Sequence, residues 1–397
     1  MSRLEYLLAS ALLRVVGLVA DLIPIRRDRV VLATARTPIL EGNLLFLHDA
    51  IRRLRPDLQV TLLLEPYAYG LRGKFRYLGR LVRGMVLLRT ARWFIVDNAY
   101  LPIHVAAHRN GTTVVQVWHA VGALKRFGWD AGRAPHDPER RFLHRHYDWV
   151  VCSAERSRGP YAAAFRTASE RVLPLGTPRV DAFADAEGLA AARARVVGRY
   201  PALAGRRVIL YAPTFRGRGA GKRAAADGLD GVALRAALPA DDILVLKTHP
   251  NLDRAATPTA GFDLVIDPVM ELNDLLAATD VLVTDYSSSI FEWALLRRPL
   301  VLLVPDLVAY EQDPGLYLDY RTEMIGTQVS DTAGVAVAIL AGRFDLTPYD
   351  AFVERHLGAA DGRASERFVR RFLGPGPAED RAITAQGATL PPDVRHE

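Results

Sequence analysis

Short apolar runs that alternate with helical segments occur in two successive blocks, and this alternation limits the possible folds more than any other feature. Most residues in each run are apolar, which is typical of a parallel strand buried on both faces. The first block has runs at 29–34, 58–64, 93–96, 112–118, 148–152 and 171–175, and the second has runs at 207–211, 242–247, 264–266, 281–284 and 300–304. This α/β pattern predicts two doubly wound, Rossmann-like domains that face each other across a cleft.

The same pattern sets the expected domain boundaries. We expect a helical segment over 1–28, a first Rossmann-like domain over 29–175 and a second over 176–373. Residues 374–397 contain four prolines and are expected to form a loose tail. The hinge between the domains is expected within 175–205.

Composition narrows the classes of partner. Lys and Arg outnumber Asp and Glu by 51 to 44, which gives a formal net charge of +7. Such a surplus suits nucleic acid, anionic lipid or a phosphorylated substrate. The basic residues are scattered and accompany no nucleic-acid-binding motif, so we expect no nucleic-acid partner. A phosphorylated substrate or an anionic membrane surface is the remaining interpretation.

Cysteine and histidine usage argues against disulfides and metal sites. Cys152 is the single cysteine, which excludes an intramolecular disulfide and is typical of a reducing compartment. The sequence has no CxxC or HExxH motif, and the close pair His144 and His146 has too few ligands around it for a structural metal. We therefore expect no metal and no cofactor.

Residues 4–25 are strongly apolar but are not typical of a membrane-spanning helix. Glu5, Arg14 and Asp21 interrupt the run and Pro24 ends it, whereas a spanning helix needs about 20 mostly uninterrupted apolar residues. The sequence that follows offers no small-residue cleavage site for a signal peptide. We expect an interfacial helix at the cytoplasmic face of the cell membrane, followed by arginines at 26, 27 and 29 that are attracted to anionic lipids. The alternative is an amphipathic helix packed on its own domain.

Polar side chains follow five of the predicted strands at their carboxyl ends. Ligands of open parallel sheets bind at that edge, so these residues are candidates for one site. The candidates are His119 and Lys125 after 112–118, Thr214 and Arg216 after 207–211, Lys247 and His249 at the end of 242–247, Asp285 with the serines after 281–284, and Asp306 and Tyr310 after 300–304.

Residues 285–289, Asp-Tyr-Ser-Ser-Ser, connect a predicted buried strand to a predicted helix start. A helix start has unpaired backbone N–H groups and the positive end of the helix dipole, so anions bind there. Ser287, Ser288 and Ser289 add hydroxyl donors for phosphate oxygens. The alternative is a serine-capped helix without a ligand.

Asp285 and Glu292 flank the serines, and each has two interpretations. Asp285 either contacts the substrate or ties the loop together through backbone N–H groups. Glu292, one turn into the helix, either accepts a hydrogen bond from a ribose hydroxyl or interacts with the helix dipole.

His119 and His249 are the candidate catalytic residues. An imidazole at a strand end can act as a general base on a hydroxyl near neutral pH, which is our interpretation of His119. His249 follows Lys247, so we expect both to neutralise phosphate. For His119 the alternative is a hydrogen bond that serves only the structure. Lys125 and Arg216 are further candidate cations of the cleft, and the alternative for each is a cation that caps a helix C-terminus or faces water.

Familiar nucleotide-binding and hydrolytic motifs are absent. The sequence has no GxGxxG loop, no GxxxxGK[ST] loop and no GxSxG elbow. Phosphate must therefore be bound by helix termini, hydroxyls and scattered cations, and no acidic cluster indicates a Mg²⁺ requirement.

These motifs, in this order, resemble those of the CDP-glycerol glycerophosphotransferase family of teichoic acid synthesis. The matching stretches are 116–128, 175–181, 210–216, 246–250, 284–292, 306–310 and 361–367. With the regions between them, the resemblance covers residues 4–373.

The resemblance implies a GT-B fold whose first domain takes the acceptor and whose second takes the CDP-linked donor. The implied reaction transfers a polyol phosphate, most simply glycerol phosphate, to a hydroxyl of a lipid-linked or polymeric cell-wall acceptor and releases CMP. His119 matches the base that acts on the acceptor. His249 and the serine loop match the residues that hold the donor diphosphate, with Thr214 and Arg216 nearby.

Two departures from the family pattern bear on the type of transferase. Ala120 and Gly122-Ala123 stand where many relatives have a glycine after the histidine and a proline before Leu-Lys, which is more like the primase-type variant. Residues 314–317, Pro-Gly-Leu-Tyr, stand where an Arg-Gly pair often precedes an aromatic stretch. The extra repeat domain of the polymerases is also missing, so we expect a single or limited transfer.

Two other functions are compatible with the same fold. A GT-B glycosyltransferase would be stabilised by a UDP- or GDP-sugar and not by CDP-polyols. A non-catalytic scaffold for envelope synthesis would keep its cellular function after His119→Ala.

Overall fold

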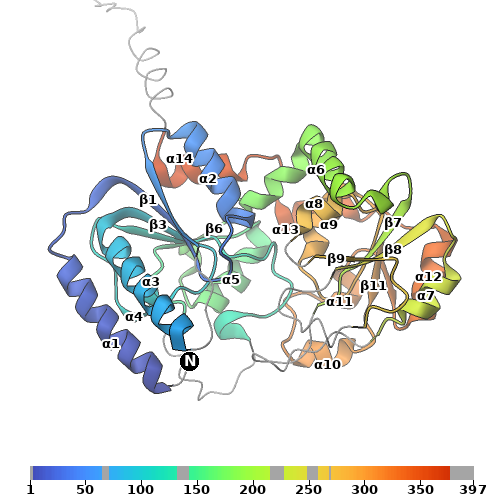
Figure 1. Ribbon diagram of the computed structural model, residues 1–397, viewed down its shortest axis with the longest axis horizontal. Coiled ribbons are helices and arrows are strands. Elements are labelled where there is room, and N and C mark those ends of the chain that lie inside the picture. Colours follow the sequence, from blue (N-terminus) through green and yellow to red (C-terminus); the bar gives the residue numbers. More distant parts are fainter. Residues whose placement is uncertain are drawn as a thin grey trace, which may run out of the picture.

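The computed structural model describes residues 3–64, 71–131, 143–214, 228–247, 258–267 and 270–375, and shows two α/β units side by side (Figure 1). Each unit is built on a six-stranded sheet, with strand orders β2-β1-β3-β4-β5-β6 and β12-β11-β10-β7-β8-β9. All the strand pairs are parallel. The predicted pair of parallel, doubly wound sheets is confirmed, whereas the cleft between them stays a prediction.

The first sheet follows the first block of apolar runs. Its strands are β1 (Arg26–Thr34), β2 (Gln59–Leu64), β3 (Ala91–Val96), β4 (Thr113–Gln116), β5 (Trp149–Val151) and β6 (Val172–Leu173). The helices of this part of the chain are α1 (Arg3–Ala20), α2 (Gly42–Leu54), α3 (Leu71–Thr90), α4 (Leu101–Val105) and α5 (Arg158–Phe165). Helices cover both faces, which buries successive residues of β1 from Val30 to Ala33 and explains why the run is apolar without alternation.

The second sheet follows the second block and adds one strand. Its strands are β7 (Arg207–Tyr211), β8 (Asp242–Lys247), β9 (Leu264–Ile266), β10 (Val281–Thr284), β11 (Leu300–Leu303) and β12 (Thr327–Val329). The helices are α6 (Ala186–Arg199), α7 (Gly231–Ala237), α8 (Leu272–Ala277), α9 (Ser289–Leu296), α10 (Leu307–Gln312), α11 (Tyr320–Glu323), α12 (Thr332–Ala341), α13 (Tyr349–Leu357) and α14 (Ala364–Leu373). The sequence did not indicate β12 because this half-buried edge strand is short and mostly polar.

The last helix, α14, crosses back to the first unit and lies beside α2 (Figure 1). Phe368 and Leu373 are buried in the same cluster as residues of β1 and α2. The Asp181 carboxylate caps the helix by accepting from the N–H groups of Ala364 and Ser365, each at 2.8 Å. The range that we assigned to the second domain therefore ends in a helix that packs on the first sheet.

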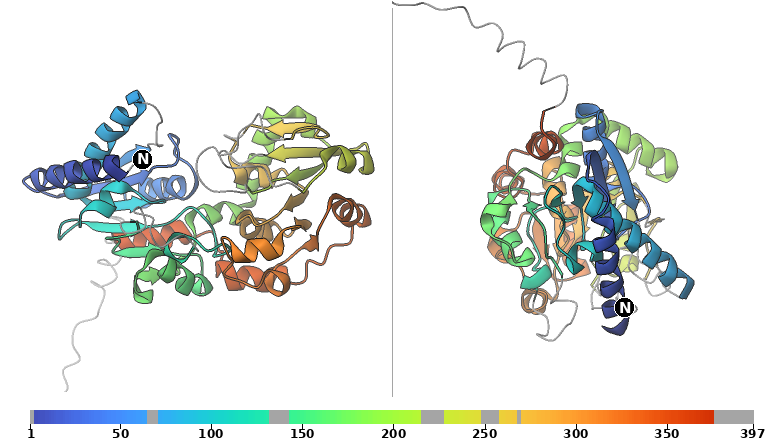
Figure 2. Two further views of the ribbon diagram at one scale, coloured as in Figure 1. Left: turned by 90° about the horizontal axis from the view of Figure 1, so that it is seen from below. Right: turned by 90° about the vertical axis from the view of Figure 1, so that its left-hand side faces the viewer.

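Helix α1 packs on its own unit along one face and exposes an apolar stripe along the other. Tyr6, Ala9 and Leu13 are buried on the inner face, and Figure 2 shows the helix at the outer edge of the first unit. Arg14 donates from Nε to the Val105 carbonyl at 3.0 Å, so the mid-helix charge is used within the protein. The exposed stripe consists of Leu4, Leu7, Leu8, Leu12, Val15, Leu18 and Val19, and it continues after the helix with Leu22 and Ile23.

Packing on the first unit, the alternative for this segment, is therefore observed, and the interfacial role stays a prediction. Of the helices that the structure describes, none combines the length and the apolar character needed to cross a bilayer. The predicted tail beyond residue 375 lies outside the described residues.

Candidate active site

His119 lies just beyond β4, where the backbone leaves the sheet abruptly. Trp118 has a left-handed conformation with φ 52°, and its N–H donates to the side-chain oxygen of Gln116 at 2.8 Å. This turn ends the strand two residues before the predicted end. The half-buried His119 places Nδ1 3.3 Å from the Asp97 carbonyl oxygen. Because a carbonyl can only accept, the contact favours a proton on Nδ1 and leaves the lone pair of the neutral imidazole on Nε2.

Asp97 is a candidate that the sequence analysis missed. It follows β3, at the point where the strand order of the first sheet reverses, which is where doubly wound sheets bind ligands. Its side chain is buried, bonds to Thr34 and lies 4.0 Å from the Arg36 guanidinium. Burial raises the pKa of this carboxyl. An acidic residue directly after an apolar run was the available signal in the sequence.

Thr214 and Asp285 meet at the corresponding reversal in the second sheet, between β7 and β10. The Asp285 carboxylate accepts from the Thr214 N–H at 2.9 Å and from the Thr214 hydroxyl at 3.0 Å. Tyr320 donates its hydroxyl to the Asp285 carbonyl. Asp285 thus connects two strand-end loops, which corresponds to the loop-tying interpretation of this residue.

The serines form a compact hydroxyl group at the start of α9. The hydroxyls of Ser287 and Ser289 lie 2.7 Å apart, and the Ser289 N–H donates to the Ser287 hydroxyl at 3.2 Å. Ser288 occupies the N-cap position without a side-chain capping bond. Hydroxyls and first-turn N–H groups at one helix start are the groups that an anion can use.

Lys125, Asp306 and Tyr310 are brought together through Tyr286, which the sequence analysis did not single out. The Tyr286 hydroxyl donates to Asp306 at 3.0 Å, and its ring stacks on Tyr310 with centroids 3.7 Å apart. The Lys125 ammonium lies 5.6 Å from the centroid of the Tyr310 ring. A cation of the first unit therefore reaches the strand ends of the second.

The loop 119–126 is embedded in the second unit. Val121 and Leu124 are buried in the same hydrophobic cluster as the core of the second sheet. Two backbone hydrogen bonds of 2.9 Å join this loop to residues 315–317. The loop that carries the candidate base is thus held against the elements that carry the serines and Tyr310.

We expect Gly122→Ala to lower the free energy of unfolding by about 1–3 kcal/mol more than Gly205→Ala, and to lower turnover. Gly122 has φ +63°, and an added Cβ would lie 2.6 Å from the Phe291 ring of α9. Gly205 is the matched control, because its φ is +70° and nothing lies within 4 Å of the added Cβ. Denaturant unfolding and a transfer assay check this prediction. Equal losses in the two variants would contradict a tight contact between the loop and α9.

Arg179 and Glu292 form a buried ion pair between the segment that joins the two units and α9. Glu292 is fully buried, and burial raises its pKa although Arg179 acts in the opposite direction. Asn43 links this pair to the loop of the candidate base. Its Oδ1 accepts from the Arg179 N–H at 3.0 Å, and its Nδ2 donates to the Trp118 carbonyl at 2.8 Å. Glu292 therefore has a structural role that neither expectation for it included.

Lys247 is buried at the end of β8. Its ammonium donates to the Met270 carbonyl at 2.8 Å. Burial lowers its pKa, whereas Glu271 and, from the first unit, Glu41 act to raise it. The ammonium thus lies where both units contribute to its electrostatic environment.

Arg216 and His249 lie outside the described residues, so their predicted roles stay predictions. Within the described ranges, no group of three or more His, Cys, Asp or Glu side chains is arranged to hold a metal ion.

Solved structures resemble this two-sheet architecture. A histidine-to-alanine variant of the wall teichoic acid polymerase TagF matches with a TM-score of 0.71 and 18% identity, over 97% of this chain and 99% of that chain. A histidine-to-asparagine variant of TagF soaked with CDPG matches with a TM-score of 0.70 and 18% identity, over 97% and 100% of the two chains. The fold therefore places the chain in the class of GT-B-like α/β proteins.

Sequence comparison gives the family. Residues 18–374 match the family described as CDP-Glycerol:Poly(glycerophosphate) glycerophosphotransferase. The teichoic acid ribitol-phosphate primase of Bacillus spizizenii is 33% identical over 370 residues, which are 90% of this chain and 95% of the primase. The teichoic acid glycerol-phosphate primase of Bacillus subtilis is 27% identical over 295 residues, 73% and 75% of the two chains.

The chain belongs to the CDP-glycerol:poly(glycerophosphate) glycerophosphotransferase family. The resemblance inferred from its motifs is confirmed. It is a transferase of the group that moves a polyol phosphate from a CDP-activated donor in teichoic acid synthesis.

Proposed function

We propose that this chain transfers a polyol phosphate to a hydroxyl of a lipid-linked or polymeric cell-wall acceptor, one unit or a few at a time, and releases CMP. The family match over residues 18–374 supports the reaction class. The observation that carries the site assignment is the embedding of the loop 119–126 in the second unit. This contact brings the loop of a strand-end imidazole onto the helix that begins with the serines.

In the proposed reaction, His119 takes the proton of the acceptor hydroxyl on Nε2. The acceptor oxygen attacks the phosphorus atom that bears the polyol, the new P–O bond forms, and the bond from that phosphorus to the CMP oxygen breaks. Negative charge passes to the phosphate of the leaving CMP. Such a transfer depends mostly on positioning and on stabilisation of this charge.

The groups proposed to hold the donor diphosphate lie at strand ends of the second unit. The hydroxyls and N–H groups at the start of α9 suit the phosphate oxygens, and the buried Lys247 supplies positive charge. The same role is proposed for Thr214, Ser287, Ser288 and Ser289, and for Arg216 and His249 outside the described residues.

The comparisons favour ribitol phosphate over glycerol phosphate as the transferred group. The match to the ribitol-phosphate primase has a higher identity and spans more of both chains than the match to the Bacillus subtilis glycerol-phosphate primase. We therefore propose CDP-ribitol as the donor, with CDP-glycerol, the donor expected from the motifs, as the alternative.

We propose that the chain binds peripherally to an anionic membrane surface, where it would meet the acceptor. The exposed apolar stripe of α1 and the basic residues that follow it are the features that support this location. A lipid-linked acceptor would then be presented near the first unit.

Thermal unfolding with CDP-ribitol, CDP-glycerol, UDP-sugars and GDP-sugars tests the proposed donor. Ligand at 100 times its dissociation constant adds about 2.7 kcal/mol to the stability of the folded chain, which raises the melting temperature measurably. We expect protection by CDP-ribitol, and CMP release when a lipid-linked acceptor is added. Protection by a sugar nucleotide alone would keep the fold and overturn the donor.

A further inference from the structure

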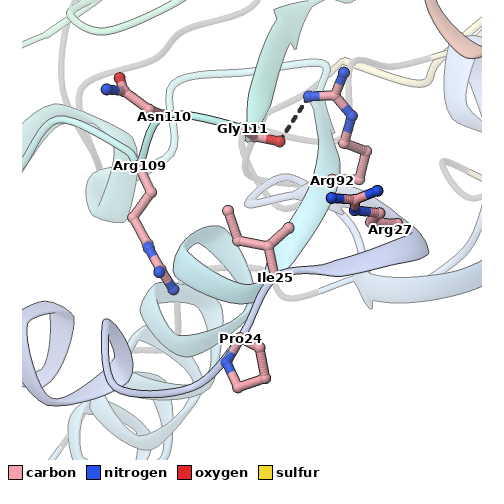
Figure 3. Close-up of a pocket in the computed structure, with 7 residues that line it drawn as sticks. All are labelled: Pro24, Ile25, Arg27, Arg92, Arg109, Asn110 and Gly111. Carbon is pink, nitrogen blue, oxygen red and sulfur yellow. Dashed lines mark hydrogen bonds between the residues drawn. The ribbon is translucent and has the colours of Figure 1, made fainter.

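A hollow of about 590 Å³ opens on the first unit, and Figure 3 shows the residues that line it. It is lined by residues at the starts of β1 and β3 and before β4, whereas the candidate base follows the end of β4. Its lining consists of Pro24, Ile25, Arg27, Arg92, Arg109, Asn110 and Gly111. Three of the seven are arginines and none is acidic, so the lining carries a net positive charge, which attracts anions.

Two of these arginines are already held in place by backbone carbonyls. Arg92 donates to the Gly111 carbonyl at 2.7 Å, and Figure 3 shows this bond between two of the lining residues. Arg109 donates to the Ile23 carbonyl at 2.6 Å and lies 3.6 Å from the Asp21 carboxylate. A guanidinium has five N–H donors, so each keeps donors for a ligand after these bonds. Fixed side chains also lose less entropy when a ligand binds.

Arg27 differs from the other two. It is exposed, and in the part of the chain that the structure describes its side chain has no hydrogen-bonding or ionic partner. Its guanidinium faces solvent with all of its N–H donors available to a ligand. A planar guanidinium fork fits two oxygens of a phosphate group.

The hollow continues directly from the exposed apolar stripe of α1. Leu22 is 85% exposed and Ile23 47% exposed, and Pro24, the next residue, lines the hollow. The stripe repeats every three to four residues along a helix that is about 27 Å long. A phospholipid has acyl chains next to a charged phosphate. The apolar stripe is complementary to the acyl chains, and the arginine-lined hollow is complementary to the phosphate.

We propose that the Arg27, Arg92 and Arg109 hollow binds the phosphate headgroup of an anionic glycerophospholipid while the α1 stripe lies in the acyl region. The proposal rests on the membrane location proposed above and adds a specific headgroup site to it. Bound in this way, the first unit has one orientation on the bilayer, with the hollow at the headgroup layer. The site is separate from the residues proposed to act on donor and acceptor.

The test is co-sedimentation of the full chain with vesicles of phosphatidylcholine alone or mixed with phosphatidylglycerol. Each arginine at an anionic surface adds about 1 kcal/mol, or about fivefold in binding, so Arg27→Ala/Arg92→Ala should lower partitioning to the mixed vesicles by about 25-fold. Binding to pure phosphatidylcholine should be unchanged.

The matched control is Arg52→Ala/Arg53→Ala, which also removes two exposed positive charges. These residues belong to α2, which covers one face of the first sheet, whereas α1 and α3 cover the opposite face. The control should lower partitioning by no more than about twofold, because salt screens charges that lie farther than about 8 Å from the bilayer. Equal losses in the two double variants would overturn a specific site and leave diffuse attraction.

Inorganic phosphate separates a lipid headgroup from a soluble anion. If phosphate raises the melting temperature of the wild type but not of Arg27→Ala/Arg92→Ala, and vesicle binding is the same in both, the lipid assignment is overturned. CMP release in detergent should be unchanged in this variant, because neither arginine is in the proposed active site. A wild type that binds mixed vesicles through these arginines but releases no CMP would support the headgroup site and contradict the proposed reaction.

Discussion

Replacing His119 by alanine is expected to lower turnover by about two to four orders of magnitude, the usual contribution of a general base. The Asp97 carbonyl holds Nδ1, so the base is proposed to act through Nε2, and alanine removes that acceptor without opening the core. Donor binding should be nearly unchanged, because the proposed donor groups lie in the second unit. Initial rates of CMP release together with donor-induced shifts in melting temperature separate the two effects.

His48→Ala is the control for this change. His48 is a surface histidine whose ring contacts the neighbouring Asp49 at 2.9 Å, and we expect it to keep wild-type turnover. Near-normal turnover of His119→Ala would remove this residue from the catalytic machinery and favour the scaffold interpretation. Loss of donor binding in the same variant would indicate a role in holding the donor.

Replacing Arg179 by methionine is expected to lower the free energy of unfolding by about 3–5 kcal/mol. Glu292 has no exposed side-chain surface, and its Oε2 has no hydrogen-bonding partner among the described residues. Loss of Arg179 would leave this carboxyl buried without a counter-charge, which is the costly outcome for a buried pair. Denaturant unfolding at neutral pH measures the difference.

The double variant Arg179→Met/Glu292→Leu separates the ion pair from simple packing. Removal of both charges should restore most of the lost stability, because well-packed apolar residues commonly replace a buried pair at little cost. Arg156→Met is the control for an exposed pair: its partner Glu323 lies 3.0 Å away, and the loss should not exceed about 1 kcal/mol. A double variant as unstable as Arg179→Met would refute the explanation by unpaired charge.

The outlines of both sheets could be predicted from the sequence because their signal is local. The run 300–304 is apolar at every position, and this pattern can be recognised without knowing any residue that is distant in the sequence. The order of the motifs likewise led to the family without any knowledge of contacts. The candidate site was predicted only in part. Thr214, Asp285 and the serines lie at strand ends as expected. Asp97 was missed although it directly follows an apolar run, whereas Asn43 and Tyr286 were missed because partners distant in the sequence give them their contacts.

The sequence by itself determined the two α/β blocks, the strand-end candidates and the family. Only the tertiary structure decided that α14 packs on the first sheet, that Val121 and Leu124 are buried in the core of the second unit, and that Arg179 pairs with Glu292. It also decided that α1 packs by one face and exposes the other. Apolar runs and turn residues act over a few positions, whereas these contacts join segments that are far apart in the chain. The hydrophobic effect that buries α14, Val121 and Leu124 has no direction of its own. Which buried surfaces meet is therefore determined by the shape of the whole assembly of helices and sheets.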